Sequence, residues 1–463
     1  MESGKGYTTN MSSGGGFDLL HAAHEKGIFI DAKPFILCFI AANIAFLTIA
    51  PLQTLHNFEL LMLISPIWLP IVVGRFAFLR WVSANRMAFL ARQEYVLLEI
   101  RVPRDVRKTP LAMEAVFSSM HLSPGESTWW KRIVLGAVRP SWSFEIVSLG
   151  GRVHLYVRTR VGFRRGLESY IYAQYPEVEI VEAADYSLLT DPSHPPYDLW
   201  GCEYKFNGKD VFPIRTYAEF MKPDSPLAKP EEQIDPLAQI IEFLGSLSPK
   251  EQFWIQIMIR VSKEEKYAGR KNAAGKKYTI LDEKNEEVEN IRTSTVRKST
   301  HVDPATGQTY ETESFPNPTK GAQNAMEALE RKVSKPLFDV GIRALYTAPQ
   351  DAYQGIVVSH LIGLWKPIAS AQGNSLNITR WHANFDDWPW EDRHGHHHAH
   401  VAHGIVDSYR RRAYFNEPYV MPWIVMNTEE LATIFHIPSS GVTTPSLPRI
   451  QSSTSEAPSN LPI

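Results

Sequence analysis

The residues best placed to do chemistry form a histidine-rich tract, HGHHHAHVAH, at 394–403. His396, His398 and His400 alternate, so on a strand they would share one face, where imidazole nitrogens could bind zinc, copper or nickel. No cysteine lies nearby, and the neighbouring carboxylates stand to one side of the tract. Histidine-rich surface segments also bind metal adventitiously. We therefore expect a solvated His-rich loop at 393–404 and no designed metal site.

The nearest approach to a phosphate-binding loop is GRKNAAGKKYT at 269–279. A Walker loop has four residues between its first glycine and the Gly-Lys pair, followed by a Ser or Thr that reaches magnesium. Here five residues separate Gly269 from Gly275, and Lys277 takes the place of the hydroxyl residue. No apolar strand leads into the segment. It is expected to be a flexible charged loop that binds no nucleotide.

The other candidates are weaker still. His21 and His24 with Glu25 do not have the spacing of a zincin motif and lie beside an apolar run. A basic cluster could contact lipid headgroups or a phosphate backbone, although a solvated face is the expected role. Its members are Arg158, Arg160, Arg164 and Arg165. No nucleophile elbow or kinase signature is present. The sequence predicts no catalytic, cofactor-binding or metal-binding residue, and therefore a protein that is not an enzyme.

Charge and cysteine content further narrow the class of protein to which the chain can belong. The 463 residues include 48 Lys plus Arg and 50 Asp plus Glu, giving a formal charge of −2. This near balance lacks the basic footprint of a dedicated nucleic-acid binder, so direct nucleic-acid binding is not expected. Cys38 and Cys202 are the only cysteines and fall in different regions. A disulfide framework is excluded, which fits a cytosolic setting for the polar part of the chain.

A long apolar stretch near the start predicts a membrane hairpin. Residues 34–74 contain no lysine or arginine, and a spanning helix needs about 20 apolar residues. Two transmembrane helices therefore fit within 34–80, joined by a tight turn at QTLHNFE, 53–59. Basic residues flank the pair but not the turn, so the positive-inside rule places both termini, including segment 1–33, in the cytoplasm. The localisation expected is the inner membrane, as a multi-pass protein. The alternative is a helical hairpin buried in a soluble core.

Beyond the apolar stretch, residues 94–186 alternate between strand and helix periodicity. The predicted order is β-α-β-β-α-β, the split pattern of ferredoxin-like domains, with helices on one face of an antiparallel sheet. Gly150–Gly151 marks a hairpin between the middle strands. The expected elements are strand 94–103, helix 110–121, strands 141–149 and 152–160, helix 163–175 and strand 177–183.

A second module with the same order is predicted at 197–425. Its elements are strand 210–217, helix 231–247, strand 252–262, strand 337–349, helix 352–370 and a strand near 374–378. A charged insert, 263–335, interrupts it and is turn-rich up to Pro318 and helical after that. The chain then ends in a Ser- and Pro-rich stretch, 438–463, expected to be a disordered linker. The fold class is thus α+β, with a transmembrane hairpin followed by two ferredoxin-like modules.

Several stretches resemble a known family. They are LEIRVPRDVRKTPLAMEAVF, WSFEIVSLGGRVHLYVRTR, ESYIYAQYPEVEIVEAADY and MNTEELATIFHIP, and the likeness is strongest over 94–186 and 420–463. They resemble the membrane and accessory region ahead of the ATPase domain in conjugation-type ATPases of bacterial type IV secretion systems, and related uncharacterised membrane proteins. In that family a Pro-rich stretch leads into the P-loop domain. The family's catalytic residues lie in that domain, so none is carried over to this sequence.

The resemblance and the apolar stretch together favour a non-catalytic scaffold. It would sit in the lipid bilayer and present cytoplasmic modules to a partner ATPase of a secretion or conjugation complex, or to further copies of itself as a homo-oligomer. One alternative is the N-terminal half of a split or truncated ATPase whose motor is encoded separately. Another is a metal-handling membrane protein that uses the His-rich loop.

Overall fold

The computed structural model describes residues 41, 44–46, 48–103, 106, 108–122, 125–221, 235–295, 298–302, 309–313, 317–379, 396–439 and 447–450. These residues divide into two compact units. The smaller unit contains the described residues up to Gln93 together with 125–139. The larger unit contains the rest of the described chain.

The smaller unit is dominated by helix α3 (Pro51–Ala91), 41 residues long. It continues through Pro66 and Pro70, and Pro51 stands at its first turn, where a missing N–H costs nothing. The predicted turn at 53–59 is therefore wrong: that segment has no glycine or proline and is helical. Of the two predicted spans within 34–80, only the second lies in α3. Of the first, residues 41, 44–46 and 48–49 are helical, whereas 34–40, 42–43 and 47, like residues 1–33, lie outside the described residues.

The larger unit is a mixed α and β body, as predicted, built on a ten-stranded sheet. Its strand order is β10-β5-β9-β6-β2-β3-β1-β14, with β4 also on β1 and β13 also on β9. Every pairing in it is antiparallel except β1 with β14. The strands are β1 (Tyr95–Pro103), β2 (Ser141–Leu149), β3 (Arg152–Arg160), β4 (Glu179–Glu182), β5 (Tyr197–Phe206), β6 (Gln252–Val261), β9 (Leu337–Pro349), β10 (Leu376–Ile378), β13 (Ile424–Asn427) and β14 (Arg449–Ile450).

The first half of the sheet contains the elements predicted for 94–186. Strands β1 to β4 lie in the order β4-β1-β3-β2, and helices α4 (Pro110–Ser119) and α5 (Arg164–Gln174) fall where predicted. The β2–β3 hairpin turns at Gly150 and Gly151, whose φ angles are 62° and 81°. A Cβ on either would lie 2.6 Å from a backbone oxygen, so only glycine fits this turn.

The second half repeats that order as β10-β5-β9-β6. Its helices are α7 (Ala238–Gly245) and α10 (Gly355–Gly363), and β6 pairs with β2 to join the halves. The predicted first strand at 210–217 is wrong, because β5 takes that place. Pro213 removes a ladder donor from the predicted segment, and the Asp210 carboxylate accepts from Val425 N. The chain there is irregular until the short helix α6 (Tyr217–Met221).

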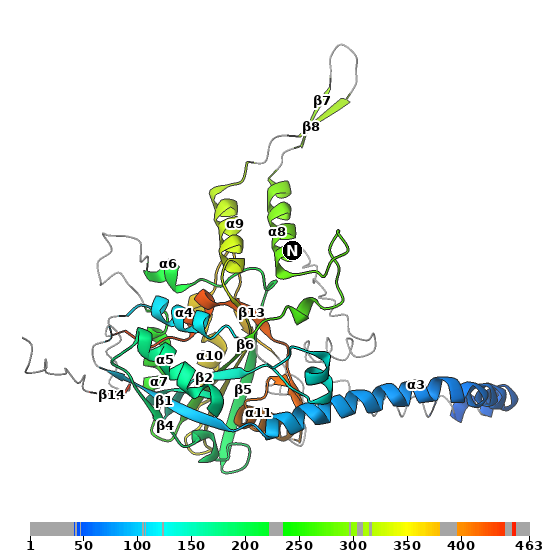
Figure 1. The fold of residues 1–463 in the computed structure, drawn as a ribbon, viewed down its shortest axis with the longest axis horizontal. Coiled ribbons are helices and arrows are strands. Elements are labelled where there is room, and N and C mark those ends of the chain that lie inside the picture. Colours follow the sequence, from blue (N-terminus) through cyan, green and yellow to red (C-terminus); the bar gives the residue numbers. More distant parts are fainter. Residues whose placement is uncertain are drawn as a thin grey trace, which may run out of the picture. The chain divides into compact units, whose positions relative to one another are not determined.

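The insert at 263–335 forms a helical arm. Helices α8 (Ile280–Ser294) and α9 (Lys320–Val333) lie side by side, with the hairpin β7 (Lys298–Val302) and β8 (Thr309–Glu313) beyond their ends (Figure 1). The prediction of a turn-rich segment up to Pro318 is wrong at α8, which begins at a capping box formed by Thr279 and Asp282. The predicted helix after Pro318 is confirmed as α9. We call residues 280–333 the arm.

Helices cover both faces of the sheet unequally. Helices α4, α5, α7, α10 and α12 (Thr428–Ile434) pack on one face, around residues such as Phe117, Phe144 and Phe435. Helix α11 (His396–Arg411) packs on the other face through Ile405, Val406 and Tyr409. Two further strands, β11 (Phe415–Asn416) and β12 (Tyr419–Val420), form a separate hairpin after α11.

Part of the predicted linker at 438–463 is docked on the sheet. Leu447 is buried, and the Arg449 guanidinium donates to the carbonyls of Pro103 (3.2 Å) and Ser439 (3.1 Å). Strand β14 extends β1 in parallel. The expectation of a disordered linker is therefore wrong for 447–450, because side-chain burial and ladder hydrogen bonds hold these residues. The remaining residues after Ser439 lie outside the described part of the chain.

Candidate functional surfaces

Helix α3 exposes a continuous apolar surface. The stretch Ser65–Ala91 has a mean hydropathy of 1.4 in its most apolar window, and none of that window is buried. It is the one described helix long and apolar enough to cross a membrane. Its exposed large side chains include Ile67, Leu69, Ile71, Val72, Val73, Phe76, Phe78, Leu79 and Trp81. A core helix of a soluble protein would bury such residues.

Helix α12 has the opposite character, because its charged residues are buried. The carboxylate of Glu430 lies 2.9 Å from the ammonium of Lys332, and both side chains are fully buried. Lys332 also donates to the carbonyl of Val425 (2.8 Å). Glu430 in turn caps its own helix, accepting from Asn427 N at 3.0 Å. This pair joins the last turn of α9, at the base of the arm, to α12.

A second layer of charges surrounds that pair. Glu429 lies 2.7 Å from Lys335 and 3.7 Å from Arg331, and Lys335 also lies 2.7 Å from Glu114 on α4. Tyr217 on α6 donates to Glu114 at 2.6 Å. We call these residues, with Glu430 and Lys332, the α12 cluster. It ties the arm to helices from both halves of the sheet.

The two acidic residues of α12 have pKa values shifted in opposite directions. Burial raises the pKa of Glu430 despite the adjacent Lys332. Burial alone would also raise the pKa of Glu429, but its bonds to Lys335 and Thr216 and the charge of Arg331 lower it overall. Glu429 is therefore a stabilising anion, and Glu430 is held in place by the donors around it.

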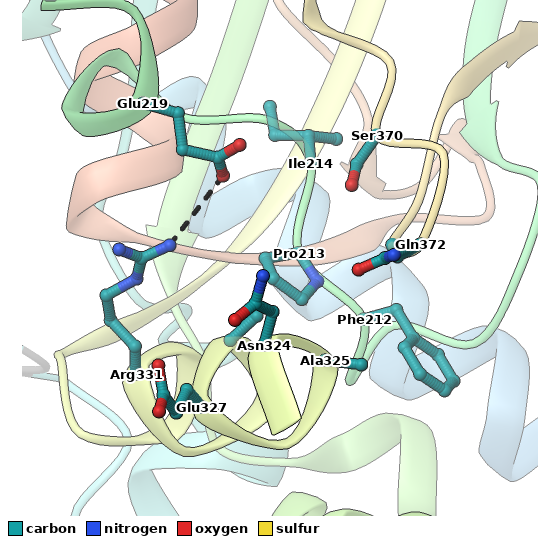
Figure 2. A pocket seen from close by; sticks show the side chains of 12 residues that line it. Phe212, Pro213, Ile214, Glu219, Asn324, Ala325, Glu327, Arg331, Ser370 and Gln372 are labelled. Atoms are coloured by element: carbon teal, nitrogen blue, oxygen red, sulfur yellow. Dashed lines mark ion pairs between the residues drawn. The ribbon is translucent and has the colours of Figure 1, made fainter. Parts of the chain in front are cut away.

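A polar cavity of about 410 Å³ lies beside the α12 cluster, between α9, α6 and the loop after η6 (Lys366–Ile368) (Figure 2). Its polar lining comes from Glu219, Asn324, Glu327, Arg331, Ser370 and Gln372. Arg331 faces Glu219 across it at 3.7 Å. The wall thus carries one guanidinium, two carboxylates, two amides and one hydroxyl. Such a lining could hold a small polar group, but it has no nucleophile paired with a base.

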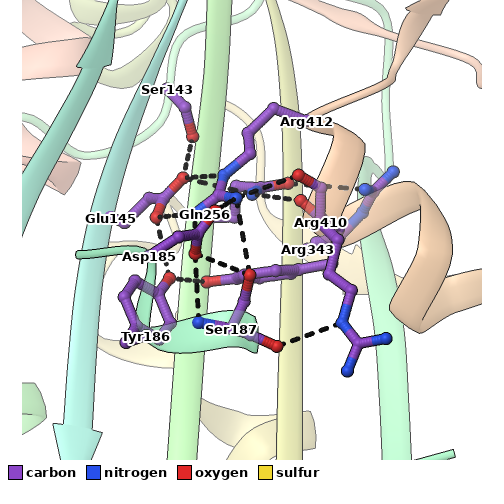
Figure 3. Close-up of polar contacts among 10 residues, drawn as sticks. Ser143, Glu145, Asp185, Tyr186, Ser187, Gln256, Arg343, Arg410 and Arg412 are labelled. Atoms are coloured by element: carbon purple, nitrogen blue, oxygen red, sulfur yellow. Dashed lines mark hydrogen bonds and ion pairs between the residues drawn. The ribbon is translucent and has the colours of Figure 1, made fainter. Parts of the chain in front are cut away.

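The other face of the sheet carries a buried polar row. Glu145 on β2, Gln256 on β6 and Arg343 on β9 occupy registered positions on adjacent strands. The row continues to Glu203 on β5, whose carboxylate accepts from Arg343 at 2.9 Å. Gln256 donates to Glu145 at 3.2 Å (Figure 3). All four side chains are buried, so each needs a partner inside the protein.

Arg412, which directly follows α11, contacts the buried polar row through Glu145. Its guanidinium donates to both carboxylate oxygens of Glu145 (3.0 and 3.1 Å) and to Asp185. Tyr186 donates to Glu145 at 2.7 Å and its hydroxyl lies 2.6 Å from that of Tyr409 (Figure 3). Burial alone would raise the pKa of Glu145 and Asp185, but Arg412 lowers both. The network fastens α11 to the sheet.

The His-rich tract is helical where it is described. His396 begins α11, so the expected loop at 393–404 is wrong from that residue onward. On a helix, positions 396 and 400 share a face and position 398 does not. The shared face of three histidines that a strand would provide is therefore not formed. Within the described residues, no three His, Cys, Asp or Glu side chains are grouped to hold a metal. The apolar spacing of Ala402, Ile405, Val406 and Tyr409 supplies the helix signal.

The remaining sequence candidates have ordinary structural roles. The Walker-like segment folds back on itself, with Lys271 bridged to Lys277 and Gly275 at φ 73°. It leads into the cap of α8. In the basic cluster, Arg164 is paired with Glu168 (2.8 Å) and Glu182 (2.7 Å), while Arg158 lies over the ring of Tyr95 at 4.1 Å. Arg160 is buried, and Arg165 starts α5 beside Arg164.

Two further predictions concern residues near the ends and the cysteines. His21, His24, Glu25 and Cys38 lie outside the described residues. Cys202 is a fully buried free thiol on β5.

The sequence reasoning overlooked two groups. The first is the acidic pair of α12, whose partners are distant in the chain. The second is the exposed pair Trp129 and Trp130, followed by Lys131 and Arg132. The run WWKR is itself a readable signal, because aromatic and basic residues together favour a membrane interface. No protein-family model matches the chain, and no curated protein sequence matches it.

Proposed function

We propose that this chain is a non-catalytic, membrane-anchored scaffold of a type IV secretion or conjugation-like transfer system, which presents its larger unit to a partner ATPase in the cytoplasm. The observation that carries the proposal is α3. Its apolar stretch is long enough to cross a bilayer, and its large apolar side chains are exposed. In water, such a surface would drive aggregation.

The proposal includes two ferredoxin-like modules in tandem. Both halves of the sheet support this, because in each the strands lie side by side in the order fourth, first, third and second along the chain. These are β4-β1-β3-β2 and β10-β5-β9-β6, and every pairing within them is antiparallel. Each half also carries helices between its first and second strands and between its third and fourth strands. This is the arrangement of the split β-α-β pattern.

A scaffold has to hold its binding surfaces in a fixed arrangement, and the buried polar contacts favour this. The α12 cluster joins the base of the arm to α4, and the Arg412 network fastens α11 to the sheet. Most of their charged groups pair with one another, and Arg331 also lines the polar cavity. The arm is the natural element for contact with a partner, because it projects both helices and a hairpin from this anchored base.

Co-purification tests the proposal. The tagged full-length chain is extracted from membranes of its own cells with mild detergent, captured, and its companions identified by mass spectrometry. We expect an ATPase with a P-loop to be retained. A matched variant, Ile71→Lys with Val72→Lys in α3, should leave the larger unit intact and lose the membrane-bound complex. Recovery of the unaltered chain as a soluble monomer without an ATPase would contradict the scaffold role.

A further inference from the structure

We infer that Trp129, Trp130, Lys131 and Arg132 form a bilayer-interface anchor, which binds anionic lipid headgroups and sets the depth of α3. The inference rests on the proposed membrane role and identifies the surface that meets the lipid. The four residues lie at the short π-helical turn η1 (Trp130–Val134) and just before it. Both tryptophans are 58% exposed, and Lys131 and Arg132 are exposed beside them.

This turn is mounted directly on α3, within the same compact unit. The Asn85 side chain of α3 donates to the carbonyl of Ile133 at 3.4 Å. Gly136, at φ 63°, brings its backbone so close that a Cβ would lie 2.3 Å from the carbonyl of Asn85. Arg139 and Glu126 close the base of the segment with an ion pair of 3.1 Å. The tryptophans are therefore held at a fixed height along α3.

That height matches a membrane interface. Residues 60–79 include one charged side chain, Arg75, and at 1.5 Å per residue span about 30 Å, the thickness of the hydrocarbon core. Arg75 lies near one end of that stretch, where long basic side chains extend to the interface. Asn85 follows Leu79 by six positions, or about 9 Å along the helix. This is the layer occupied by headgroups.

The side chains match what that layer offers. Indole rings prefer the boundary between acyl chains and headgroups, because an apolar ring carries one polar N–H. Lysine and arginine next to them are attracted by the negative charge of anionic lipids. Arg80 and Arg86 on α3, and Arg92 at its C-cap, add positive charge around the same level. The occupant of this surface is therefore an anionic bilayer.

Site-directed spin labelling of the full chain tests the anchor. Cys38 is replaced by serine so that it does not take up the label, and Cys202 is kept because it is fully buried. The protein is reconstituted into phosphatidylcholine vesicles containing phosphatidylglycerol. Labels are placed at Trp130→Cys, at Val72→Cys in α3 and at Glu289→Cys on the exposed side of α8. Collision rates with oxygen, which partitions into lipid, and with a water-soluble nickel chelate report the depth of each label.

We expect the nickel collision rate at position 130 to be several-fold lower than at 289, and the rate at 72 to be lowest. A label at 130 that behaves like 289, while 72 remains in lipid, would overturn the anchor and leave the membrane role standing. Labels at both 72 and 130 that behave like 289 would overturn the membrane role itself. A label at 130 shielded from both reagents would indicate a protein contact in place of lipid and would also overturn the anchor.

A second variant separates charge from aromatic packing. Replacing Lys131 and Arg132 by serine in the Trp130→Cys protein should markedly reduce the difference in depth between vesicles with and without phosphatidylglycerol, and the arginines of α3 account for what is left. The matched control, Lys276→Ser with Lys277→Ser, removes two exposed charges from the larger unit and should keep that difference. An unchanged lipid dependence in the first variant would contradict headgroup binding by these residues.

Discussion

Helices α3 and α12 reverse the usual distribution of side chains. The apolar stretch Ser65–Ala91 of α3 has no buried residue in its most apolar window, whereas all seven residues of α12, including Glu429 and Glu430, are buried. An exposed apolar helix needs a solvent other than water, and a buried acidic helix needs internal cations. The comparison teaches that the sequence of α3 is suited to apolar surroundings outside the protein, whereas that of α12 is suited to charged partners inside it.

The largest effect is expected at the centre of the α12 cluster. Lys332→Met keeps the volume and length of the side chain but leaves the Glu430 carboxylate buried without its cation. Breaking a buried pair in this way costs about 3–5 kcal/mol. The free energy of unfolding of the full chain in detergent, followed by intrinsic fluorescence, measures the loss. Lys284→Met on the partly exposed side of α8 is the control and should change little. An equally small effect of both variants would mean that α12 is not held by its charges.

Arg412→Met tests whether the network of Arg412, Glu145 and Asp185 contributes to the free energy of unfolding as the α12 cluster does. Removing the guanidinium leaves Glu145 and Asp185 without their shared partner and should cost about 3 kcal/mol at neutral pH. The folded pKa values of both carboxyls lie below their ordinary values of 4.5 and 3.8. Their stabilisation is thus present above those values and is lost as the pH falls below them.

The acid dependence provides the check on that network. Since Arg412 holds both pKa values down, Arg412→Met should flatten the loss of unfolding free energy as the pH is lowered below about 4.5. Unfolding curves at a series of pH values measure this. Glu430 has a raised pKa, so its contribution is most favourable below 4.5 and weakens as the pH rises through its folded pKa. If the free energy of unfolding of the variant fell with decreasing pH as steeply as that of the unaltered protein, the role assigned to Arg412 would be contradicted.

The smallest effects compare a buried cap with a half-buried one. Helix α12 begins at the capping box of Asn427 and Glu430, and α8 at that of Thr279 and Asp282. Thr279→Ala should cost about 1 kcal/mol, the usual value for a cap. Asn427→Ala should cost about 2 kcal/mol, because its amide also donates to the buried carbonyl of Lys332. Denaturation midpoints of the two variants decide the order. Equal losses would remove the distinction between the buried and the half-buried cap.

Much of the larger unit was predictable because its signals are local. The alternation in β2 and β3 and the Gly150–Gly151 turn specify a hairpin without reference to distant residues. All six elements expected in 94–186 appear within a few residues of their predicted bounds. The long buried strands β6 and β9 were equally clear.

The remaining elements depend on contacts that are remote in the sequence. Strand β5 follows a Pro-rich segment and mixes polar with apolar residues, and its place is fixed by pairing with β9 and β10, which lie far away in the sequence. Helix α8 is highly charged and has a weak apolar face. The candidate sites were harder still: Lys332 meets Glu430, and Glu145 meets Arg412, only in the folded chain. No spacing rule connects residues so far apart.

The central claim is that α3 holds the protein in a lipid bilayer, and membrane fractionation tests it most directly. Washed membranes from cells producing the full chain are treated with alkaline carbonate and centrifuged. The account predicts that the chain stays in the pellet, and that Ile71→Lys with Val72→Lys shifts it to the supernatant, since each lysine within the bilayer costs about 3 kcal/mol. Recovery of the unaltered chain in the supernatant of lysed cells, without detergent, would contradict the account.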